Sequence, residues 1–566
     1  MKNKFYFFAL FLICGNALLL SVKAQAPAWS WATSHGAVSN DIGTSITTDA
    51  NGNVYATGYF SDASITIGTT TLVNANSSGS SADIYVAKFD GSGNSLWAMS
   101  FGGTNDDRGQ SIITDPAGNF YLTGSFQSAS ITFGSIQLNN VNSSNLSDVY
   151  LAKFNSSGTA IWATKGGGPF HDLSGSVGID GAGNLYITGS FNSAAIAFGT
   201  FIQSNSSSNY NMFITKFDNN GNVKWLKRPI GANYDYANAL VADANGNIYV
   251  TGSFNGPSIT FGSTVLTNTL TNSPGFFLAK CDSAGIPIWA KSASGTAFNQ
   301  GFGVTLDAAG DVIVTGQYGG TSLTFGSVTI TNQNGGYGGA FIAKYDTAGN
   351  AIWAKSGDGV NTSSNNTGWS VATDINNQIF CTGSFTGPSI TFGSTVLSNS
   401  GSLGTTDVFV AGFDLNGTPL WAKSAGGTNT EVGRGIATTL SGCLFVTGNS
   451  HSSSMAMDNI TLTGTGTGSV FFAQLCPTTG EQEISTNDSH FIFPNPSSGI
   501  FYAELKSQQE ITGIEIYNLI GEKVLSVSAK AQKLLLVDLS GRAAGLYFYR
   551  IKNGDQIIGS GKMIVD

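Results

Sequence analysis

The sequence predicts an all-β chain, a ring of seven four-stranded sheets followed by a small C-terminal β-sandwich. One unit recurs seven times, at steps of 66, 65, 63, 64, 67 and 65 residues. A Thr-Gly pair marks each copy, with its glycine at Gly58, Gly124, Gly189, Gly252, Gly316, Gly383 and Gly448. A second marker keeps nearly the same period: Trp31, Trp97, Trp162, Trp225, Trp289, Trp353 and Trp421. Such a period indicates a supersecondary unit that buries its apolar face only against its neighbours.

Each copy is interpreted as four strands separated by tight turns. The second copy shows the order, with strands near 110–114, 119–126, 149–154 and 160–164. The first turn begins at Asp115, whose side chain caps its own backbone, and Gly118 takes the position that needs a positive φ. Short runs of alternating polarity between such turns are typical of antiparallel sheets.

A further short segment lies between the second and third strands of the inner copies. It reads Ile-Thr-Phe-Gly or a close variant, at 131–134, 196–199, 259–262, 323–326 and 390–393. We interpret it as an extra hairpin on the same edge of every sheet.

The two ends of the repeat region are out of phase, and this predicts how the ring closes. Trp31 precedes the first copy, whereas the seventh copy ends at Cys476 with no Trp strand after it. The segment 29–33 is therefore predicted to form the outermost strand of the last sheet. That closure leaves no free sheet edge and predicts a seven-bladed β-propeller over residues 25–477.

The core D-x-x-G-N-x-Y-x-T-G, followed by an A-K-F-D strand and a Trp strand, resembles the SBBP family of β-propeller repeats. The resemblance covers about 450 residues of the chain and departs from the pattern at Ser441-Gly-Cys443. It implies the fold and no particular activity.

The N-terminal segment has the features of a secretory signal. Lys2 and Lys4 precede an apolar run from 5 to 22, and small residues favour cleavage near Ala24. We expect residues 1–24 to be removed on export. No other run is long enough to cross a bilayer, so the mature chain is expected to have no transmembrane segment.

The C-terminal part begins after a polar linker at 478–489, where the period disappears. Residues 490–566 read as about seven short strands of a small Ig-like sandwich. The motifs at 493–499, 514–525, 537–551 and 562–566 together resemble the type A C-terminal sorting domain of the type IX secretion system of Bacteroidota. The resemblance implies passage through the periplasm and recognition by the secretion machinery. It also implies removal of the domain by a sortase-like protease, with the product released or attached to the cell surface.

Cysteine positions agree with an exported protein. Cys443 begins the second strand of the last copy and Cys476 ends the third, so antiparallel pairing brings them to one edge of the sheet. We predict a disulfide between them. Cys281 and Cys381 fall in different copies and replace apolar strand residues, which predicts buried free thiols.

Charge and motifs exclude several classes of function. Residues 25–489 hold 14 Lys and Arg against 27 Asp and Glu, a net charge of −13, which disfavours nucleic acid as a partner. Four His without metal-ligand spacing, and one Asp per turn, favour neither a metal site nor a cofactor. We predict no enzyme activity, and we expect the repeated Trp residues to pack between sheets.

The candidate binding site lies in the connections that differ between copies, because function concentrates in variable loops on a rigid scaffold. These connections supply Asp107, Arg108, His171, Asp172, Tyr234, Asp235, Tyr236, Phe298, Trp369, Glu431 and Arg434. Aromatic rings beside Asp and Arg suit an extracellular glycan or protein ligand, which predicts a binding or adhesion module.

Three alternatives remain at this point: a polysaccharide hydrolase or lyase, a structural surface-layer component, or loops that only pack against the ring. A pair of carboxylates such as Asp107 and Glu431 in an axial pocket would favour the enzyme. An aromatic-lined groove without such a pair would favour binding.

Overall fold

The computed structural model describes residues 26–477 except 37–38, 77, 143–144, 206, 208, 232, 271–272, 333–337, 360–364, 403 and 464–467. It also describes residues 491–565 except 494–496, 505–511, 519–520, 530–533 and 555. All the regular elements in these residues are β-strands. The chain divides into two compact units, Met1–Pro477 and Thr478–Asp566. The expected signal peptide (1–24) and linker (478–489) lie outside the described residues.

The larger unit repeats one antiparallel arrangement of four strands, written here from the innermost strand outward. The first three groups are β2 (Ile42–Thr48), β3 (Val54–Phe60), β6 (Asp83–Phe89), β7 (Ser95–Phe101); β8 (Asp107–Thr114), β9 (Phe120–Phe126), β12 (Asp148–Phe154), β13 (Ala160–Gly167); and β14 (Asp172–Ile179), β15 (Leu185–Phe191), β18 (Asn211–Phe217), β19 (Val223–Lys227). The next three are β21 (Asp235–Ala242), β22 (Ile248–Phe254), β25 (Gly275–Cys281), β26 (Pro287–Ser292); β28 (Asn299–Leu306), β29 (Val312–Tyr318), β32 (Gly339–Tyr345), β33 (Ala351–Gly359); and β34 (Thr367–Thr373), β35 (Ile379–Phe385), β38 (Asp407–Phe413), β39 (Pro419–Gly427). The last is β40 (Glu431–Thr438), β41 (Leu444–Ser450), β44 (Ser469–Cys476) and β1 (Ala28–His35).

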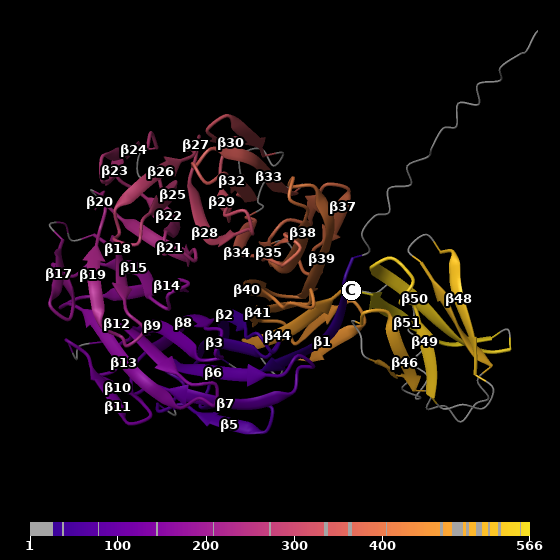
Figure 1. Cartoon of the computed structure of the whole chain (residues 1–566). Helices are drawn as coiled ribbons and strands as arrows, with labels where there is room; N and C mark the ends of the chain where they lie inside the picture. The colour runs from indigo at the N-terminus through magenta and orange to yellow at the C-terminus, as the bar shows by residue number, and fades with distance from the viewer. Residues whose placement is uncertain are drawn as a thin grey trace, which may run out of the picture. The chain divides into compact units, whose positions relative to one another are not determined.

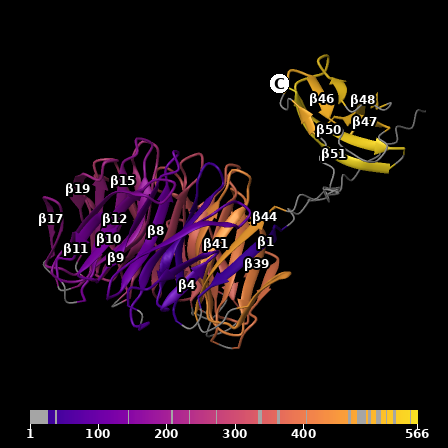
Figure 2. The ribbon, with the colours of Figure 1, turned by 90° about the horizontal axis from the view of Figure 1, so that it is seen from below.

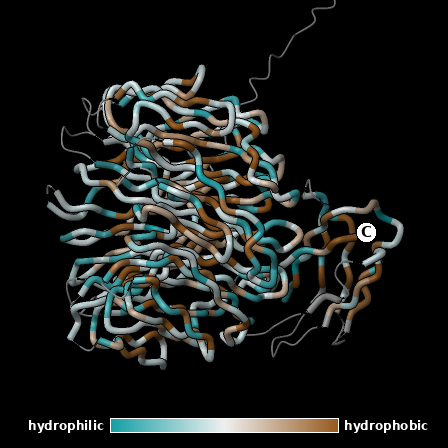
Figure 3. Tube along the Cα trace, turned by 90° about the vertical axis from the view of Figure 1, so that its left-hand side faces the viewer, coloured by the Kyte–Doolittle hydropathy of each residue, from teal (hydrophilic) through white to brown (hydrophobic). Residues whose placement is uncertain are grey.

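These sheets stand around one axis. Each innermost strand lies against the next: β2 against β8, β8 against β14, and so on to β40, which lies against β2 (Figure 1). Strand residues with apolar side chains fill the space between neighbouring sheets; for example, Phe445, Val470 and Phe472 of the last sheet pack in one cluster with Ile46 and Val54 of the first. Figure 3 shows hydrophobic and hydrophilic segments alternating along the chain of this unit.

The N-terminal strand closes the circle as the sequence predicts. β1 pairs antiparallel with β44, with Ala28 opposite Cys476, Ala32 opposite Ala473 and His35 opposite Val470 (Figure 2). Trp29 is buried in the same apolar cluster as Leu475. The first and last parts of the repeat region therefore share one sheet.

Extra hairpins lie at the periphery (Figure 1). They are β4 (Ser64–Ile67) with β5 (Thr70–Val73), β10 (Ser130–Phe133) with β11 (Ile136–Asn139), β16 (Ala195–Phe198) with β17 (Phe201–Ser204), β23 (Ser258–Phe261) with β24 (Thr264–Thr267), β30 (Ser322–Phe325) with β31 (Val328–Thr331), β36 (Ser389–Phe392) with β37 (Thr395–Ser398), and β42 (Ser454–Met457) with β43 (Ile460–Thr463). The first and last of them lack the Phe-Gly signature, which is why the sequence indicated only the inner five; Asp458 takes the positive-φ turn position at φ 49°. Several hairpins pair with the preceding sheet, as β16 does with β13 and β42 with β39. The short strands β20 (Ile230–Gly231) and β27 (Ser294–Gly295) make the same link.

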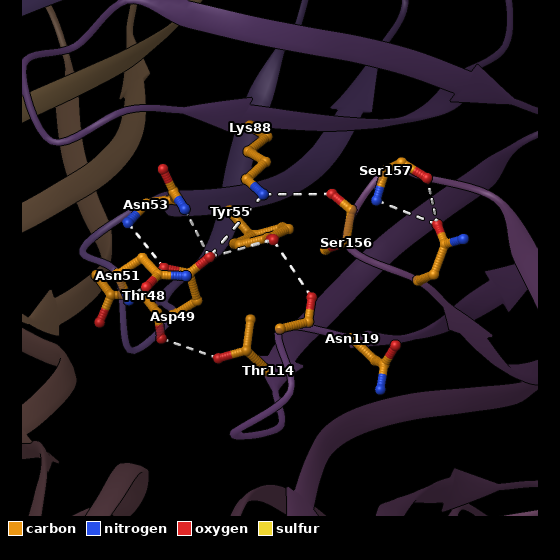
Figure 4. A network of polar contacts seen from close by, with 12 residues as sticks. Thr48, Asp49, Asn51, Asn53, Tyr55, Lys88, Thr114, Asn119, Ser156 and Ser157 are labelled. Atoms are coloured by element: carbon orange, nitrogen blue, oxygen red, sulfur yellow. Dashed lines mark hydrogen bonds and ion pairs between the residues drawn. The ribbon is translucent and has the colours of Figure 1, made fainter.

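The repeated turn after each innermost strand is stabilised by one side chain. In the first copy, Asp49 accepts hydrogen bonds from the backbone N–H groups of Asn51 and Asn53, both at 2.9 Å (Figure 4). Tyr55 donates its hydroxyl to the same carboxylate at 3.4 Å, and Lys88 lies 3.9 Å from it. These donors occupy the carboxylate oxygens, so the turn is a structural element that repeats in the later copies.

The repeated Trp residues connect neighbouring sheets, as predicted. Trp162 donates its indole N–H to the carbonyl of Asn219 at 3.0 Å, in the turn of the next sheet. Trp289 does the same with Thr347 at 3.1 Å, and Trp353 with Leu415 at 2.9 Å. Their position is explained by packing within the ring rather than by ligand binding.

The smaller unit has two antiparallel sheets. One is β45 (Phe491–Phe493), β46 (Ile500–Glu504) and β49 (Leu534–Asp538); the other is β48 (Lys523–Ser528), β47 (Gly513–Tyr517), β50 (Gly545–Asn553) and β51 (Gln556–Val565). Phe501 and Val537 of the first sheet and Ile514 and Met563 of the second form one buried cluster. The unit therefore has its own core between two sheets.

Candidate functional site

Four of the predicted site residues are buried at one repeated position. Asp107, Asp172, Asp235 and Glu431 are each the first residue of an innermost strand, and each is at most 1% exposed. Asp41, Asn299 and Asn366 hold the same place in the other copies and are equally buried. The seven positions follow one another at the same steps as the Thr-Gly pair, 66, 65, 63, 64, 67 and 65 residues. They belong to the repeat, and not to the variable part of the loops to which the sequence interpretation assigned them.

Three of these buried side chains, those of Asp107, Asp172 and Glu431, accept hydrogen bonds from neighbouring loops. Asp107 accepts hydrogen bonds from the backbone N–H of Gly103 at 2.8 Å and of Gln127 at 3.0 Å, and from the hydroxyl of Ser128 at 2.7 Å. Glu431 accepts from the backbone N–H of Gly427 at 2.8 Å and from the hydroxyl of Ser450 at 3.0 Å. Their oxygens are therefore occupied by internal donors. Sheet 1, built on β2, lies between the two sheets that carry them, and the structure does not bring them together as a pair.

Burial also changes the ionisation of the carboxyl groups on this side of the ring. Burial raises the pKa of Asp172 and Asp41 to about 8, that of Asp235 to about 7 and that of Asp107 to about 6. A carboxyl group whose pKa is raised on folding stays protonated in the native state while the unfolded chain ionises. Each group therefore favours the folded state below the ordinary pKa of 3.8, and this contribution is lost as pH rises toward the raised value.

We expect the ring to lose stability between about pH 4 and pH 8, by on the order of a few kcal/mol. Asp172→Asn should flatten this dependence, because the side chain cannot ionise and asparagine already occupies the same position at 299 and 366. Urea unfolding at several pH values measures the effect. A free energy of unfolding that rises from pH 5 to pH 8 would contradict this expectation.

The residue three positions after each buried side chain points to the axis. In each innermost strand the register shifts there, as between Gly368 and Ser370 of β34 and between Gly433 and Gly435 of β40. A β-bulge of this kind redirects one side chain. The bulged residues are Thr44, Gln110, Gly175, Asn238, Phe302, Trp369 and Arg434, and all of them line one cavity of about 390 Å³. We call these seven residues the axial ring.

The axial ring has two chemically different sides. Phe302 and Trp369 lie 4.6 Å apart between ring centroids, and the guanidinium of Arg434 lies 5.3 Å from the centre of the Trp369 ring. On the other side, Thr44 donates to the carbonyl of Gly109 at 2.8 Å, and Asn238 donates to that of Gly301 at 2.8 Å. Both polar residues thus contact the next innermost strand. One side of the cavity is aromatic and cationic, and the other consists of small polar groups.

Arg434 is the charged residue of this cavity. Among the described residues that line it there is no Asp or Glu. Arg434 donates from Nε to the side-chain oxygen of Asn449 at 3.0 Å. Burial lowers the pKa of Arg434 from its ordinary value, because its charge is removed from water. The site therefore offers a partly buried cation to whatever enters the cavity.

Tyrosines extend the aromatic surface away from the axis. Tyr236 lines the cavity, and its ring lies 6.4 Å from that of Tyr234, with 10° between the planes. Tyr210, which the sequence did not indicate, lies 5.7 Å from Tyr236. Tyr234 is 43% exposed, so the three rings form a partly open platform beside the cavity.

The other predicted site residues lie around this centre. Arg108 pairs with Asp106 at 2.9 Å and lies 4.8 Å from the centre of the Tyr59 ring. It lines an adjoining cavity of about 250 Å³, which shares Gln110, Leu173 and Ser174 with the axial one. His171 lies 3.3 Å from the hydroxyl of Ser147. Phe298 is half-buried. The described residues that line the axial cavity do not include Arg108, His171 or Phe298.

Sequence reasoning found Trp369 and Arg434 but missed Thr44, Gln110, Gly175, Asn238 and Phe302. The signal was available, because all seven positions keep the period of the repeat. It was hidden because a position that changes its chemistry from Gly to Trp between copies does not look like a repeated one. The residue before Trp369 is a glycine for a steric reason. A Cβ added to Gly368 would lie 2.1 Å from the hydroxyl oxygen of Thr315 in the preceding sheet.

The predicted disulfide is present, on the sheet that closes the ring. Cys443 and Cys476 are bonded, with their Cα atoms 4.2 Å apart, while Cys281 and Cys381 are buried free thiols. Cys476 also pairs with Ala28 of β1. The disulfide therefore ties β44, the partner of the closing strand, to the residue that precedes β41.

We expect loss of this disulfide to cost about 2–4 kcal/mol of unfolding free energy. Cys443→Ser combined with Cys476→Ser should lower the urea midpoint, and reductant should lower it only in the parent chain. Cys281→Ala, at a cysteine outside the disulfide, is the control and should leave the response to reductant intact. Equal midpoints for the double variant and the parent chain would argue against this role.

Comparison with known proteins identifies two parts of the chain. Residues 491–566 match the family model of a secretion system C-terminal sorting domain, and residues 224–257 match that of a beta-propeller repeat. An uncharacterized WD repeat-containing protein of Acanthamoeba polyphaga mimivirus is 24% identical over 339 residues, which is 50% of this chain and 24% of that protein. The chain thus matches about a quarter of the length of this curated relative.

Solved structures also resemble the chain at low identity. The Pan2 WD40 domain of Neurospora crassa is 10% identical with a TM-score of 0.36, covering 80% of this chain and 98% of that one. A fungal alcohol oxidase is 12% identical with a TM-score of 0.38, covering 96% of this chain and 100% of that one.

The described residues contain no helix that is both long and apolar enough to span a membrane. They also contain no group of three or more His, Cys, Asp or Glu side chains that could hold a metal ion. The sorting domain directs the chain through type IX secretion to the cell surface or the extracellular space. The protein is therefore an exported β-propeller protein with a type IX sorting domain.

Proposed function

We propose that this exported protein is a binding or adhesion module that takes an extracellular glycan or protein ligand at the axial face of a seven-bladed propeller. The observation that carries the proposal is the axial ring, in which each innermost strand places its bulged residue, a different residue type in every copy, at a single cavity. Aromatic and cationic groups on one side and small polar groups on the other suit a ligand with both apolar faces and hydrogen-bonding groups.

The lining also bears on the alternative of a polysaccharide hydrolase. Glycosidases require two carboxyl groups that flank the bond to be cleaved. The described lining of the axial cavity supplies none, and Asp107 and Glu431 are engaged by backbone and serine donors. Binding therefore remains the first proposal.

The same proposal includes the organisation of the chain. Residues 1–24 would be the signal peptide, 25–477 the propeller, 478–489 a linker and 490–566 an Ig-like sorting domain. The sorting domain binds the type IX secretion machinery. A sortase-like protease would then remove this domain and release the propeller or attach it to the surface.

A glycan array probed with the purified secreted protein tests this function. We expect binding to a restricted set of glycans, lost in Trp369→Ala and kept in Phe201→Ala, which removes an aromatic ring on the peripheral strand β17. A protein that binds no glycan and no protein of the cell surface would contradict the proposal. Release of new reducing ends from a bound glycan would favour the hydrolase instead.

A further inference from the structure

Arg434 is a cation without an acidic partner in a cavity built from all the innermost strands. The other arginine near the axis, Arg108, pairs with Asp106 at 2.9 Å. In contrast, the described ion pairs include none with Arg434, whose Nε is held by the neutral side chain of Asn449. Holding an unpaired guanidinium away from water costs free energy unless an anion completes the site. The arrangement therefore favours a negatively charged ligand.

The electrostatic surroundings permit an anion despite the acidic composition of the chain. Among the carboxyl groups that begin the innermost strands, burial raises the pKa of Asp172 to about 8 and that of Asp235 to about 7. Near neutral pH both groups therefore carry less negative charge than exposed carboxylates would, which reduces repulsion toward an anion in the cavity. The net charge of −9 overstates the negative potential at the axis.

The groups beside Arg434 suit the ring of a sugar. The parts of the Trp369 and Phe302 rings that line the cavity offer apolar surface against which the C–H groups of a pyranose can pack. The serine side chains of the lining, Ser45, Ser111, Ser174, Ser176 and Ser370, together with Gln110, can exchange hydrogen bonds with hydroxyl groups. The cavity of about 390 Å³ lies at the lower end of the range for small-ligand sites.

We propose that the axial ring binds a carboxylate-bearing sugar, a uronic acid residue of a polysaccharide, with Arg434 holding the carboxylate and Trp369 and Phe302 packing against the sugar ring. This inference rests on the proposed binding function and adds the class of ligand. A planar guanidinium forms two parallel hydrogen bonds with a carboxylate, which a hydroxyl group cannot match. An acidic peptide would need apolar pockets for its anchoring side chains, whereas more than half of the lining residues are Gly, Ala, Ser, Thr or Asn.

Calorimetry on the full secreted protein with a panel of uronic acid oligosaccharides tests this inference. The panel contains trimers of galacturonate, glucuronate, mannuronate and guluronate, each with its methyl ester and its carboxyl-reduced neutral form. We expect at least one acidic trimer to bind at least about tenfold more tightly than its ester and its neutral form. We also expect its affinity to fall as salt concentration rises.

Variants of Arg434 test whether this residue binds the carboxylate of the sugar. Arg434→Gln should weaken binding of the acidic trimer by about tenfold or more and abolish the preference over the ester, while Arg434→Lys should keep part of it. Lys224→Gln is the control and should change affinity by less than about twofold, because Lys224 pairs with Asp218 at 2.8 Å and does not line this cavity. Unchanged unfolding midpoints show that the variants are folded.

The possible outcomes distinguish failure of the uronic acid inference from failure of the proposed binding function. Glycan binding that is equal for acid and ester, or unaffected by Arg434→Gln, overturns the inference and leaves the binding function standing. Preference for an acidic peptide over every uronic acid trimer overturns the sugar class. Absence of binding to glycans and to proteins of the cell surface overturns both.

Discussion

Deleting β1, residues 28–35, is expected to destabilise the ring by about 5 kcal/mol or more, or to prevent the secreted protein from accumulating. The deletion removes the whole pairing with β44, and it takes Trp29 out of the apolar cluster that includes Leu475 and Ala473. It also leaves β44 as an unpaired edge, which favours aggregation. Urea unfolding and size-exclusion chromatography of the secreted material measure the two effects.

A permuted chain provides the control for this deletion. In this variant residues 26–36 are moved to follow Pro477, just after the end of β44. The same antiparallel pairing can then form as a hairpin between β44 and the moved strand. We expect this variant to recover most of the lost stability, because the connection between β1 and β2 is then the only one missing. A permuted chain as unstable as the deletion would indicate that β1 contributes something other than this pairing.

Removing the sorting domain, residues 491–566, is expected to stop export at the periplasm. The domain matches the C-terminal sorting model over its whole length and has its own core between two sheets. We expect the amount outside the cell to fall by at least about tenfold, while the ring remains folded, because the two units are separately compact. Immunoblots of periplasmic and extracellular fractions measure this.

Fusing residues 478–566 to a periplasmic reporter protein tests whether the domain is sufficient. The fusion should appear outside the cell, and the same reporter without these residues should not. Extracellular accumulation of the shortened chain in normal amounts would show that the signal for export lies elsewhere.

Much of the fold could be predicted from the sequence because the same sequence markers recur in every copy. The Thr-Gly pair, the Asp turns and the Trp strand each recur with one period, so every copy supports the interpretation of the others. The position of β1 followed from a mismatch between Trp31 and Cys476. The disulfide followed from antiparallel pairing within one copy. What the sequence did not show was that the peripheral hairpins pair with the preceding sheet, because such contacts cross between copies.

The site was predictable only in part, for a physical reason. Variable loops were expected to carry function, and Trp369 and Arg434 were found in this way. Asp107, Asp172 and Glu431 belong to the same loops, but the chain buries them where they accept hydrogen bonds from backbone N–H groups. A polar residue in a loop is ambiguous between these two roles until its burial is known. Phe302 was missed because an aromatic residue in a strand is usually part of the core.

The most direct test of the account is whether β1 and β44 are partners in the protein made by cells, because the axial ring exists only if the circle closes there. Ala32 and Ala473 are register partners, as are Ala98 and Ala87 in the first sheet. We predict that the pair Ala32→Cys and Ala473→Cys forms a disulfide as completely as the control pair Ala98→Cys and Ala87→Cys, as read by peptide mass spectrometry. The mismatched pair Ala32→Cys and Ala87→Cys should stay reduced. Free thiols at 32 and 473, with the control pair bonded, would contradict the closed ring.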